Sequence, residues 1–303
     1  RFSKLKSSRA ISPPLKYTEI FDFREKGSGF PRGAKAAIVA DVGEAMKIEQ
    51  VAAQLYTLRD HLQTADQVAK TLRRVRKIGY EAVQLSGIGP LDPKDLADML
   101  DGEGLVCCAT HENAQAILET PEAVVEKLNI LDCAHTAYPF PSGVDFSSMK
   151  RLKEFAARLD AAGAVLARNG KILSYHNHDI EFRRVKGRLI LEYIFDNTDP
   201  ENLKAELDTH WVQAGGGSVT AWCRRLMGRM PLIHLKDFAL DDDRQRRFAE
   251  VGAGNMSWSE IIEAAENSGC RWFIVEQDAH WIDNDPFRSL KTSYRYLRDQ
   301  IAV

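Results

Sequence analysis

From Val51 to the C-terminus, short apolar runs alternate with longer stretches whose apolar residues recur at helical spacing. This alternation is typical of βαβ units, in which helices connect parallel strands. Eight strands are expected, at residues 51–56, 80–85, 105–110, 133–138, 172–176, 204–208, 232–236 and 271–276. Eight strand–helix alternations in about 250 residues is the number found in a (β/α)8 barrel, so an α/β TIM barrel is the predicted fold.

An open, doubly wound sheet is the competing fold. Such a sheet places a glycine-rich phosphate turn after its first strand. Residues 56–61 read Tyr-Thr-Leu-Arg-Asp-His and contain no glycine. The sequence therefore favours the barrel over the open sheet.

Helix signals between the strands fit the same interpretation. Thr64 is expected to cap a helix that carries Val68, Leu72 and Val75 at helical spacing. A long helix is expected over 146–169 despite Gly163, with Gly170 suited to its C-terminal stop. A last helix, 286–300, is expected to close the ring.

The first 50 residues differ from the rest of the chain. Prolines and glycines punctuate them, and no amphipathic period persists. We therefore expect an irregular N-terminal extension over residues 1–50 and one barrel domain over residues 51–303. The sequence assigns no function to the extension.

Charge and apolar content exclude several classes of protein. Lys and Arg number 41 against 43 Asp and Glu, which argues against a nucleic-acid partner. No apolar run approaches the ~20 residues of a membrane span, and no apolar segment of a signal peptide follows the basic start. A cytoplasmic protein is expected, although a leader removed before Arg1 stays compatible with the sequence. The five cysteines lack metal-ligand spacing and are expected to be free, mostly buried thiols.

Four successive strands end in side chains that bind metals. The fifth expected strand ends at His176, the sixth at Asp208, the seventh contains His234 and the eighth ends at Glu276. The active sites of TIM barrels lie where strands end, so these side chains are expected to meet at one mouth. Mixed imidazole and carboxylate ligands suit manganese, zinc, cobalt or iron better than calcium.

Each residue alone has an ordinary structural alternative. An aspartate at a strand end is often a helix cap, and a lone histidine or glutamate is often only a surface or core residue. The prediction of a metal site depends on the four occurring together. His176 and His178 share a parity, so either can face the site, and we take His176 as the ligand and His178 as a substrate contact.

Further side chains are candidates for chemistry or substrate binding. Lys236 lies two residues after His234 and is expected to act as an acid or to stabilise an oxyanion, alongside Glu276 and His176 as catalytic groups. Solvent exposure, core packing and surface ion pairs are the alternatives for the other candidates. The candidate substrate contacts are His178, His111, Glu112, His210, Trp211 and Arg59. On the second strand, Glu81 and Gln84 have opposite parity, so at most one should face into the barrel.

Several stretches resemble the xylose isomerase-like TIM-barrel superfamily, which includes sugar phosphate isomerases and epimerases, inosose dehydratases and abasic-site endonucleases. The resemblance covers the chain from about Val51 onward. The matching stretches are 54–59 (QLYTLR), 78–85 (IGYEAVQL), 175–179 (YHNHD), 207–216 (LDTHWVQAGG), 234–237 (HLKD) and 275–278 (VEQD).

The resemblance implies one divalent ion, often manganese, with zinc, cobalt, magnesium or iron as alternatives. Asp208, His234 and Glu276 match three of the family's four usual ligands, and His176 stands where a glutamate is usual. In the ketose epimerases of the family, that glutamate and the glutamate of strand eight remove and return a proton on opposite sides of the substrate. The departure at His176 also suits a one-sided elimination.

We therefore expect a metal-dependent isomerase or epimerase that removes a proton next to a carbonyl. A lyase or hydrolase acting on a keto-sugar or inosose at the same site is the alternative. The expected partners are a small sugar, a sugar phosphate or a cyclitol, with no nucleic acid and no membrane, and a homo-oligomer is possible. An abasic-site endonuclease is disfavoured because Trp211 stands where a histidine for a second metal would be expected, and a non-catalytic binding protein stays open.

Overall fold

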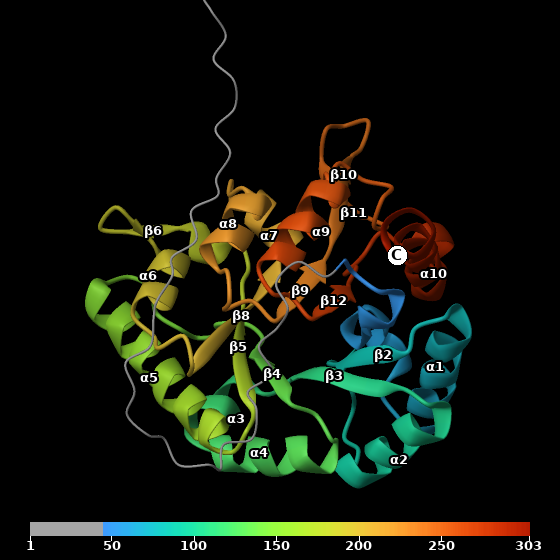
Figure 1. Cartoon of the computed structure of the whole chain (residues 1–303), viewed down its shortest axis with the longest axis horizontal. Coiled ribbons are helices and arrows are strands. Elements are labelled where there is room, and N and C mark those ends of the chain that lie inside the picture. Colours follow the sequence, from blue (N-terminus) through green and yellow to red (C-terminus); the bar gives the residue numbers. More distant parts are fainter. Residues whose placement is uncertain (1–44) are drawn as a thin grey trace, which may run out of the picture. The chain divides into compact units, whose positions relative to one another are not determined.

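The computed structural model describes residues 45–303, so the extension expected over residues 1–50 lies almost wholly outside the described residues. Within the described residues, eight parallel strands close into a barrel in the order β1-β12-β9-β8-β5-β4-β3-β2. Helices surround this barrel (Figure 1). The predicted TIM barrel is confirmed.

The barrel strands lie close to the predicted positions. They are β1 (Val51–Gln54), β2 (Ala82–Leu85), β3 (Val106–His111), β4 (His135–Tyr138), β5 (Ile172–His176), β8 (Leu203–Asp208), β9 (Leu232–Leu235) and β12 (Trp272–Val275). Two small antiparallel pairs lie outside the barrel sheet. They are β6 (Arg184–Val185) with β7 (Arg188–Leu189), and β10 (Asp237–Leu240) with β11 (Arg246–Ala249).

Ten α-helices occur in the described part of the chain. They are α1 (Ala65–Ile78), α2 (Pro93–Glu103), α3 (Ala114–Glu119), α4 (Pro121–Ile130), α5 (Met149–Arg168), α6 (Ile190–Asp196), α7 (Thr209–Ala214), α8 (Val219–Arg225), α9 (Trp258–Asn267) and α10 (Pro286–Tyr296). No helix among residues 45–303 has both the length and the apolar character that a bilayer crossing requires.

Local capping explains where several elements begin and end. Thr64 caps α1 as expected, in a reciprocal capping box with Gln67. The first strand is shorter than predicted because the Gln54 side chain accepts a hydrogen bond from the backbone N–H of Tyr56. That bond turns the chain into a 3-10 helix, Leu55–His61, instead of continuing the strand.

The inside of the barrel changes from apolar to polar along the strands. Ala52, Ala82, Leu232 and Ile274 belong to one small buried cluster. Since side chains alternate along a strand, the residues two positions further on also point inward. Those positions are occupied by Gln54, Gln84, His234 and Glu276. The small apolar residues therefore form a floor beneath a polar layer at the mouth.

The five cysteines are free and buried, as predicted. No C-x-x-C pair or disulfide constrains the described chain, so the barrel is held by packing. A large apolar cluster between the strands and the helices includes Leu72 of α1, Leu159 of α5 and Phe273 of β12.

Gly163 explains how α5 packs so closely beside the β8 side of the barrel. A Cβ at this position would lie 2.0 Å from the backbone oxygen of Asn202, which directly precedes β8. The oxygen belongs to the main chain and cannot rotate away as a side chain would. The glycine inside the predicted helix is therefore a close-contact position.

We expect Gly163→Ala to lower the free energy of unfolding by about 1–3 kcal/mol, because the added methyl group must push the helix from the strand. Urea unfolding measures this change. Gly102→Ala is the matched control, since Gly102 lies in α2 with no atom within 4 Å of its Cβ position. The control should be neutral or slightly stabilising, because alanine favours helix over glycine. Equal effects of the two substitutions would contradict the close-contact role.

Candidate active site

Four predicted ligand residues meet at the mouth of the barrel. His176, Asp208, His234 and Glu276 each offer a ligand atom, and these atoms all lie within 4.8 Å of one another. Nε2 of His176 and Nδ1 of His234 lie 3.9 and 4.0 Å from Asp208 Oδ2. Nδ1 of His234 lies 2.9 Å from Glu276 Oε2. All four side chains are buried.

The register of the parallel strands produces this convergence. His176 on β5 pairs with Glu206 on β8, and Asp208 on β8 pairs with His234 on β9. Glu276 follows the last residue of β12 directly. Strand ends in a barrel lie on one rim, so ligands from four different strands need no long loop to meet.

Asp208 has two structural roles. Its Oδ1 accepts the backbone N–H of Trp211 at 2.9 Å and so caps α7. Its Oδ2 points to the cluster and is buried without a hydrogen-bond partner in the described structure. The helix cap, the ordinary explanation of this residue, is therefore correct for one oxygen, while the other points to the cluster and the Lys236 ammonium.

Lys236 lies among three carboxylates. Its Nζ is 3.2 Å from Asp208 Oδ2, 2.8 Å from Glu276 Oε2 and 3.0 Å from Asp278 Oδ2. Burial would lower the pKa of Lys236, but the three carboxylates outweigh burial and hold the pKa above its ordinary value. The side chain is therefore an ammonium at neutral pH and can donate a proton or a hydrogen bond.

The other charges follow from the same neighbours. Burial lowers the pKa of His176 to about 3, so this imidazole is neutral. Burial would also lower the pKa of His234, but Glu206 and Glu276 raise it to about 10. Burial raises the pKa of Asp208 to about 6, while Lys236 and His234 oppose that rise.

The donor set fits a divalent cation. Glu206, Asp208 and Glu276 are buried carboxylates, and among residues 45–303 the buried cations beside them are Lys236 and His234. An excess of buried negative charge is costly unless another cation compensates it. Oδ2 of Asp208 has no hydrogen-bond partner among the described residues, faces the Lys236 ammonium at 3.2 Å and lies where such a cation would be bound. Two imidazoles and two carboxylates are ligands that suit manganese, zinc, cobalt and iron.

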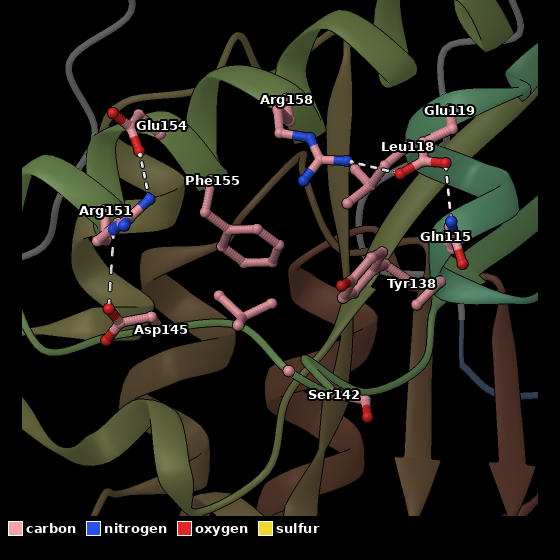
Figure 2. Close-up of a pocket in the computed structure, with 13 residues that line it drawn as sticks. Gln115, Leu118, Glu119, Tyr138, Ser142, Asp145, Arg151, Glu154, Phe155 and Arg158 are labelled. Atoms are coloured by element: carbon pink, nitrogen blue, oxygen red, sulfur yellow. Dashed lines mark hydrogen bonds and ion pairs between the residues drawn. The ribbon is translucent and has the colours of Figure 1, made fainter.

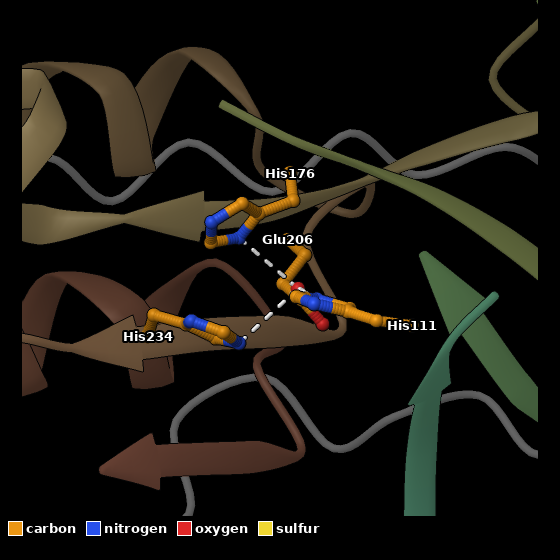
Figure 3. A group of neighbouring side chains, drawn as sticks. All are labelled: His111, His176, Glu206 and His234. Carbon is orange, nitrogen blue, oxygen red and sulfur yellow. Dashed lines mark hydrogen bonds and ion pairs between the residues drawn. The ribbon is translucent and has the colours of Figure 1, made fainter. Parts of the chain in front are cut away.

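A second polar layer lies directly beneath the first and was missed from the sequence. Glu206 Oε1 lies 2.5 Å from His111 Nε2 and 3.1 Å from nitrogens of both His176 and His234 (Figure 3). Gln84 donates its amide to Glu206 Oε2 at 2.6 Å. The available signal was spacing, because Glu206 precedes Asp208 by two residues and therefore shares its face of β8. Gln84 is buried and Glu81 exposed, so one of this pair faces inward, as expected.

A cavity of about 490 Å³ opens over the cluster. Predicted residues that line it include His176, Glu276, Lys236, His178, His111 and Arg59. Tyr56, Ser86, Phe140 and Asp278 line it as well, although the sequence did not single them out. The volume is in the range of small-molecule sites.

Three predicted substrate contacts do not line this cavity, although the Trp211 ring centroid lies 5.4 Å from that of His178, which does. Glu112 pairs with Lys127 at 2.9 Å beside a smaller neighbouring cavity. His210 and Trp211 are not lining residues of the 490 Å³ cavity. The hairpin β10–β11 brings Phe248 against both rings, with centroids 4.6 and 6.1 Å away, so their contacts are largely aromatic.

Another pocket, of about 400 Å³, is lined by residues of α3, α5 and the β4–α5 connection (Figure 2). Its charged side chains pair with one another. Arg158 lies 3.5 Å from Glu119, and Arg151 lies 3.7 Å from Asp145. These groups neutralise each other, so the pocket has no feature comparable to the metal-ligand cluster.

Buried Glu181 organises the loop that carries His178. The hydroxyl of Tyr175 donates to Glu181 Oε1, and the backbone N–H of His178 donates to Oε2, both at 2.8 Å. Burial raises the pKa of Glu181 to about 7, and the two hydrogen bonds limit the rise. The two hydrogen bonds of Glu181 therefore go to Tyr175 and His178 and to none of the four predicted metal ligands.

The comparisons with known proteins agree with this geometry. Residues 72–300 match the family model described as xylose isomerase-like TIM barrel. A sugar phosphate isomerase/epimerase from Parabacteroides distasonis superposes with a TM-score of 0.73 at 23% identity, covering 86% of this chain and 98% of that one. An L-ribulose 3-epimerase superposes with a TM-score of 0.62 at 15% identity, covering 82% and 92%. At these identities, the superpositions establish the fold alone.

An inosose dehydratase from Mesomycoplasma hyopneumoniae is 25% identical over 174 residues. That match covers 50% of this chain and 56% of the relative. The chain therefore spans about half the length of this curated relative.

Glu181 predicts a pH dependence of stability. The pKa of the Glu181 carboxyl is about 7 in the folded protein and about 4.5 in the unfolded chain. As pH rises between these values, the unfolded chain releases the proton first, so the free energy of unfolding falls. The loss should reach the order of 3 kcal/mol by pH 7.5. In Glu181→Gln this pH-dependent fall in the free energy of unfolding should be absent, and urea unfolding from pH 5 to 7.5 measures it. Parallel pH curves for the wild type and the variant would argue against the raised pKa.

Proposed function

We propose that this chain, which belongs to the xylose isomerase-like TIM barrel family, is a divalent-metal-dependent isomerase or epimerase of a sugar or sugar phosphate. The observation that carries the proposal is the convergence of His176, Asp208, His234 and Glu276 beneath a 490 Å³ cavity. These four side chains would hold the ion. When bound, the ion would polarise a substrate carbonyl and stabilise negative charge on its oxygen.

The protein's own groups supply the proton transfers. Glu276 is ionised because Lys236 and His234 outweigh the effect of burial on its pKa, so it can accept a proton from the carbon next to a carbonyl. The electrons of that C–H bond move to the carbonyl oxygen and give an enediolate. The Lys236 ammonium, 2.8 Å from Glu276, can donate a hydrogen bond to the charge that develops.

Return of the proton determines the product. A proton returned to the opposite face of the same carbon gives an epimer, and one returned to the neighbouring carbon gives an isomer. His176 would hold the ion through Nε2 and lies with Nδ1 beside Glu206, so the Lys236 ammonium, 2.8 Å from Glu276, is the proposed second proton carrier. Arg59 and His178 line the cavity and are proposed to bind substrate oxygens.

A lyase or hydrolase acting on a keto-sugar or inosose is the second candidate. His176 breaks the symmetry of two carboxylates, which suits a reaction in which one base removes a proton and a leaving group departs with another. The similarity to an inosose dehydratase over half the chain also supports this class. NMR of keto-sugar and inosose panels in deuterated water separates the two, since an isomerase or epimerase conserves the molecular formula of its substrate.

Metal removal is the direct test of the proposal. We expect protein stripped with EDTA to lose activity on the panel and added manganese to restore it, because the ligand cluster leaves buried negative charge uncompensated without an ion. Asp208→Asn should lower manganese affinity at least tenfold while keeping the cap of α7, because asparagine is also a good N-cap. Full activity of the stripped protein would refute the metal mechanism.

Replacement of the proposed base gives a second test, made at a manganese concentration that keeps the variant loaded, because Glu276 is also a proposed metal ligand. Glu276→Gln keeps the shape of the side chain but removes its basicity, so turnover and deuterium uptake should fall by about 10²–10⁴-fold. Glu81→Gln is the control, because Glu81 is half-exposed and pairs with Arg76 outside the barrel. Deuterium exchange in Glu276→Gln at the wild-type rate would exclude Glu276 as the base.

A further inference from the structure

We propose that Glu206 is a positioning residue that sets which nitrogen of His176 and of His234 faces the metal site. The inference rests on the proposed metal dependence. Glu206 is fully buried on β8, and its Oε1 lies within 3.1 Å of nitrogens from His111, His176 and His234 (Figure 3). One carboxylate oxygen is therefore shared by three imidazoles.

The hydrogen bonds of Gln84 fix the orientation of His234. A carboxylate only accepts hydrogen bonds, so the amide nitrogen of Gln84 must face Glu206, and the amide oxygen must face the opposite way. That oxygen lies 2.6 Å from His234 Nε2 and also accepts the amide of Gln54 at 2.8 Å. Nε2 of His234 is therefore a donor, flanked by two acceptors.

His176 presents the opposite nitrogen to the same carboxylate. Its Nδ1 has no hydrogen-bond partner in the described structure, and Glu206 Oε1 lies 3.1 Å away but outside hydrogen-bonding angles. Burial leaves Nδ1 no access to water, so the carboxylate is the acceptor available when the ring turns. This places the proton on Nδ1.

The imidazoles of His176 and His234 thereby direct their lone pairs to the proposed metal site. With Nδ1 protonated, His176 offers Nε2, which lies 3.9 Å from Asp208. When an ion displaces the second proton of the cationic ring, His234 keeps the proton on Nε2 and offers Nδ1, which lies 2.9 Å from Glu276. Buried partners of metal-binding imidazoles commonly set the tautomer and raise ligand basicity. Glu206 sets the tautomer and raises the basicity of the His176 and His234 imidazoles.

The competing interpretation is that Glu206 is a ligand of a second ion, since His111, His176, Glu206 and His234 also lie close enough to share one. His176 and His234 would then have to bridge two ions and lose both ring protons. The amide oxygen of Gln84 opposes that state, because at 2.6 Å it would face the lone pair of a deprotonated His234 Nε2. We therefore favour the positioning role.

The experiment uses zinc as a diamagnetic probe of the full chain. Long-range ¹H–¹⁵N spectra of ¹⁵N-histidine-labelled protein report the tautomer of each ring, with His176→Gln and His234→Gln assigning the signals. In the wild type, with and without zinc, we expect His176 to carry its proton on Nδ1. With zinc bound, His234 should carry its proton on Nε2. This measurement needs no variant at Glu206.

Glu206→Gln tests the cause. Its amide oxygen must face the donating Gln84, so its NH₂ group would face the imidazoles and require lone pairs from them. We expect the His176 tautomer to invert and the zinc affinity to fall about 10–100-fold. Glu266→Gln is the control, since the Glu266 carboxylate accepts the backbone N–H of Met46 away from the cluster, and it should change neither.

Three outcomes would overturn the inference. One is a wild-type His176 protonated on Nε2, and another is a Glu206→Gln protein with unchanged tautomers and zinc affinity. The third is two zinc ions per wild-type chain with one lost in Glu206→Gln, which would make Glu206 a ligand. Failure of the proposed function appears differently, as wild-type protein that binds no zinc, and the metal-free His176 tautomer would still test the role of Glu206.

Discussion

Negative charge buried at the centre of the barrel is the constraint on which the rest of the site depends. Glu206, Asp208 and Glu276 have almost no contact with solvent. Carboxylates in such surroundings are unfavourable unless cations and hydrogen bonds compensate them. Lys236 and His234 compensate part of this charge, and the remainder explains why the mouth is suited to a divalent cation and why the neighbouring pKa values are displaced.

Because side chains alternate along a strand, the buried polar residues of the barrel lie in two layers, two residues apart. Glu206 and Asp208 are two residues apart on β8, and Gln84 lies on the same side of its own strand, two residues after Ala82. In our proposal, Glu206 and Gln84 of the lower layer orient the imidazoles of His176 and His234, and the upper layer presents the ligand atoms to an ion. Beneath both, small apolar side chains fill the lumen, so the polar layers rest on a dry floor. The two-residue alternation of side chains along each strand thus determines both the apolar floor of the barrel and the polar layers of the site.

Much of the barrel and of the upper layer could be predicted from the sequence. Apolar runs define the strands, and a ligand-type residue at the end of each of four strands is visible without coordinates. Glu206 could not be recognised alone, because a single charge within a strand is usually solvated. The environments of His210 and Trp211 depend on the hairpin β10–β11, which places Phe248, 38 and 37 residues further along the chain, against their rings. Only the tertiary structure supplies that contact.

The contrast between positions 208 and 176 bears on how such sites diversify. Asp208 must start a helix with one oxygen and serve the barrel mouth with the other, and only a short acid satisfies both demands. No helix begins at His176, whose strand runs into a loop. A substitution at position 176 therefore removes no helix cap, although it changes a neighbour of Glu206 and His234. The chemistry of the mouth is thus separate from helix capping at position 176, whereas at position 208 one side chain joins the two.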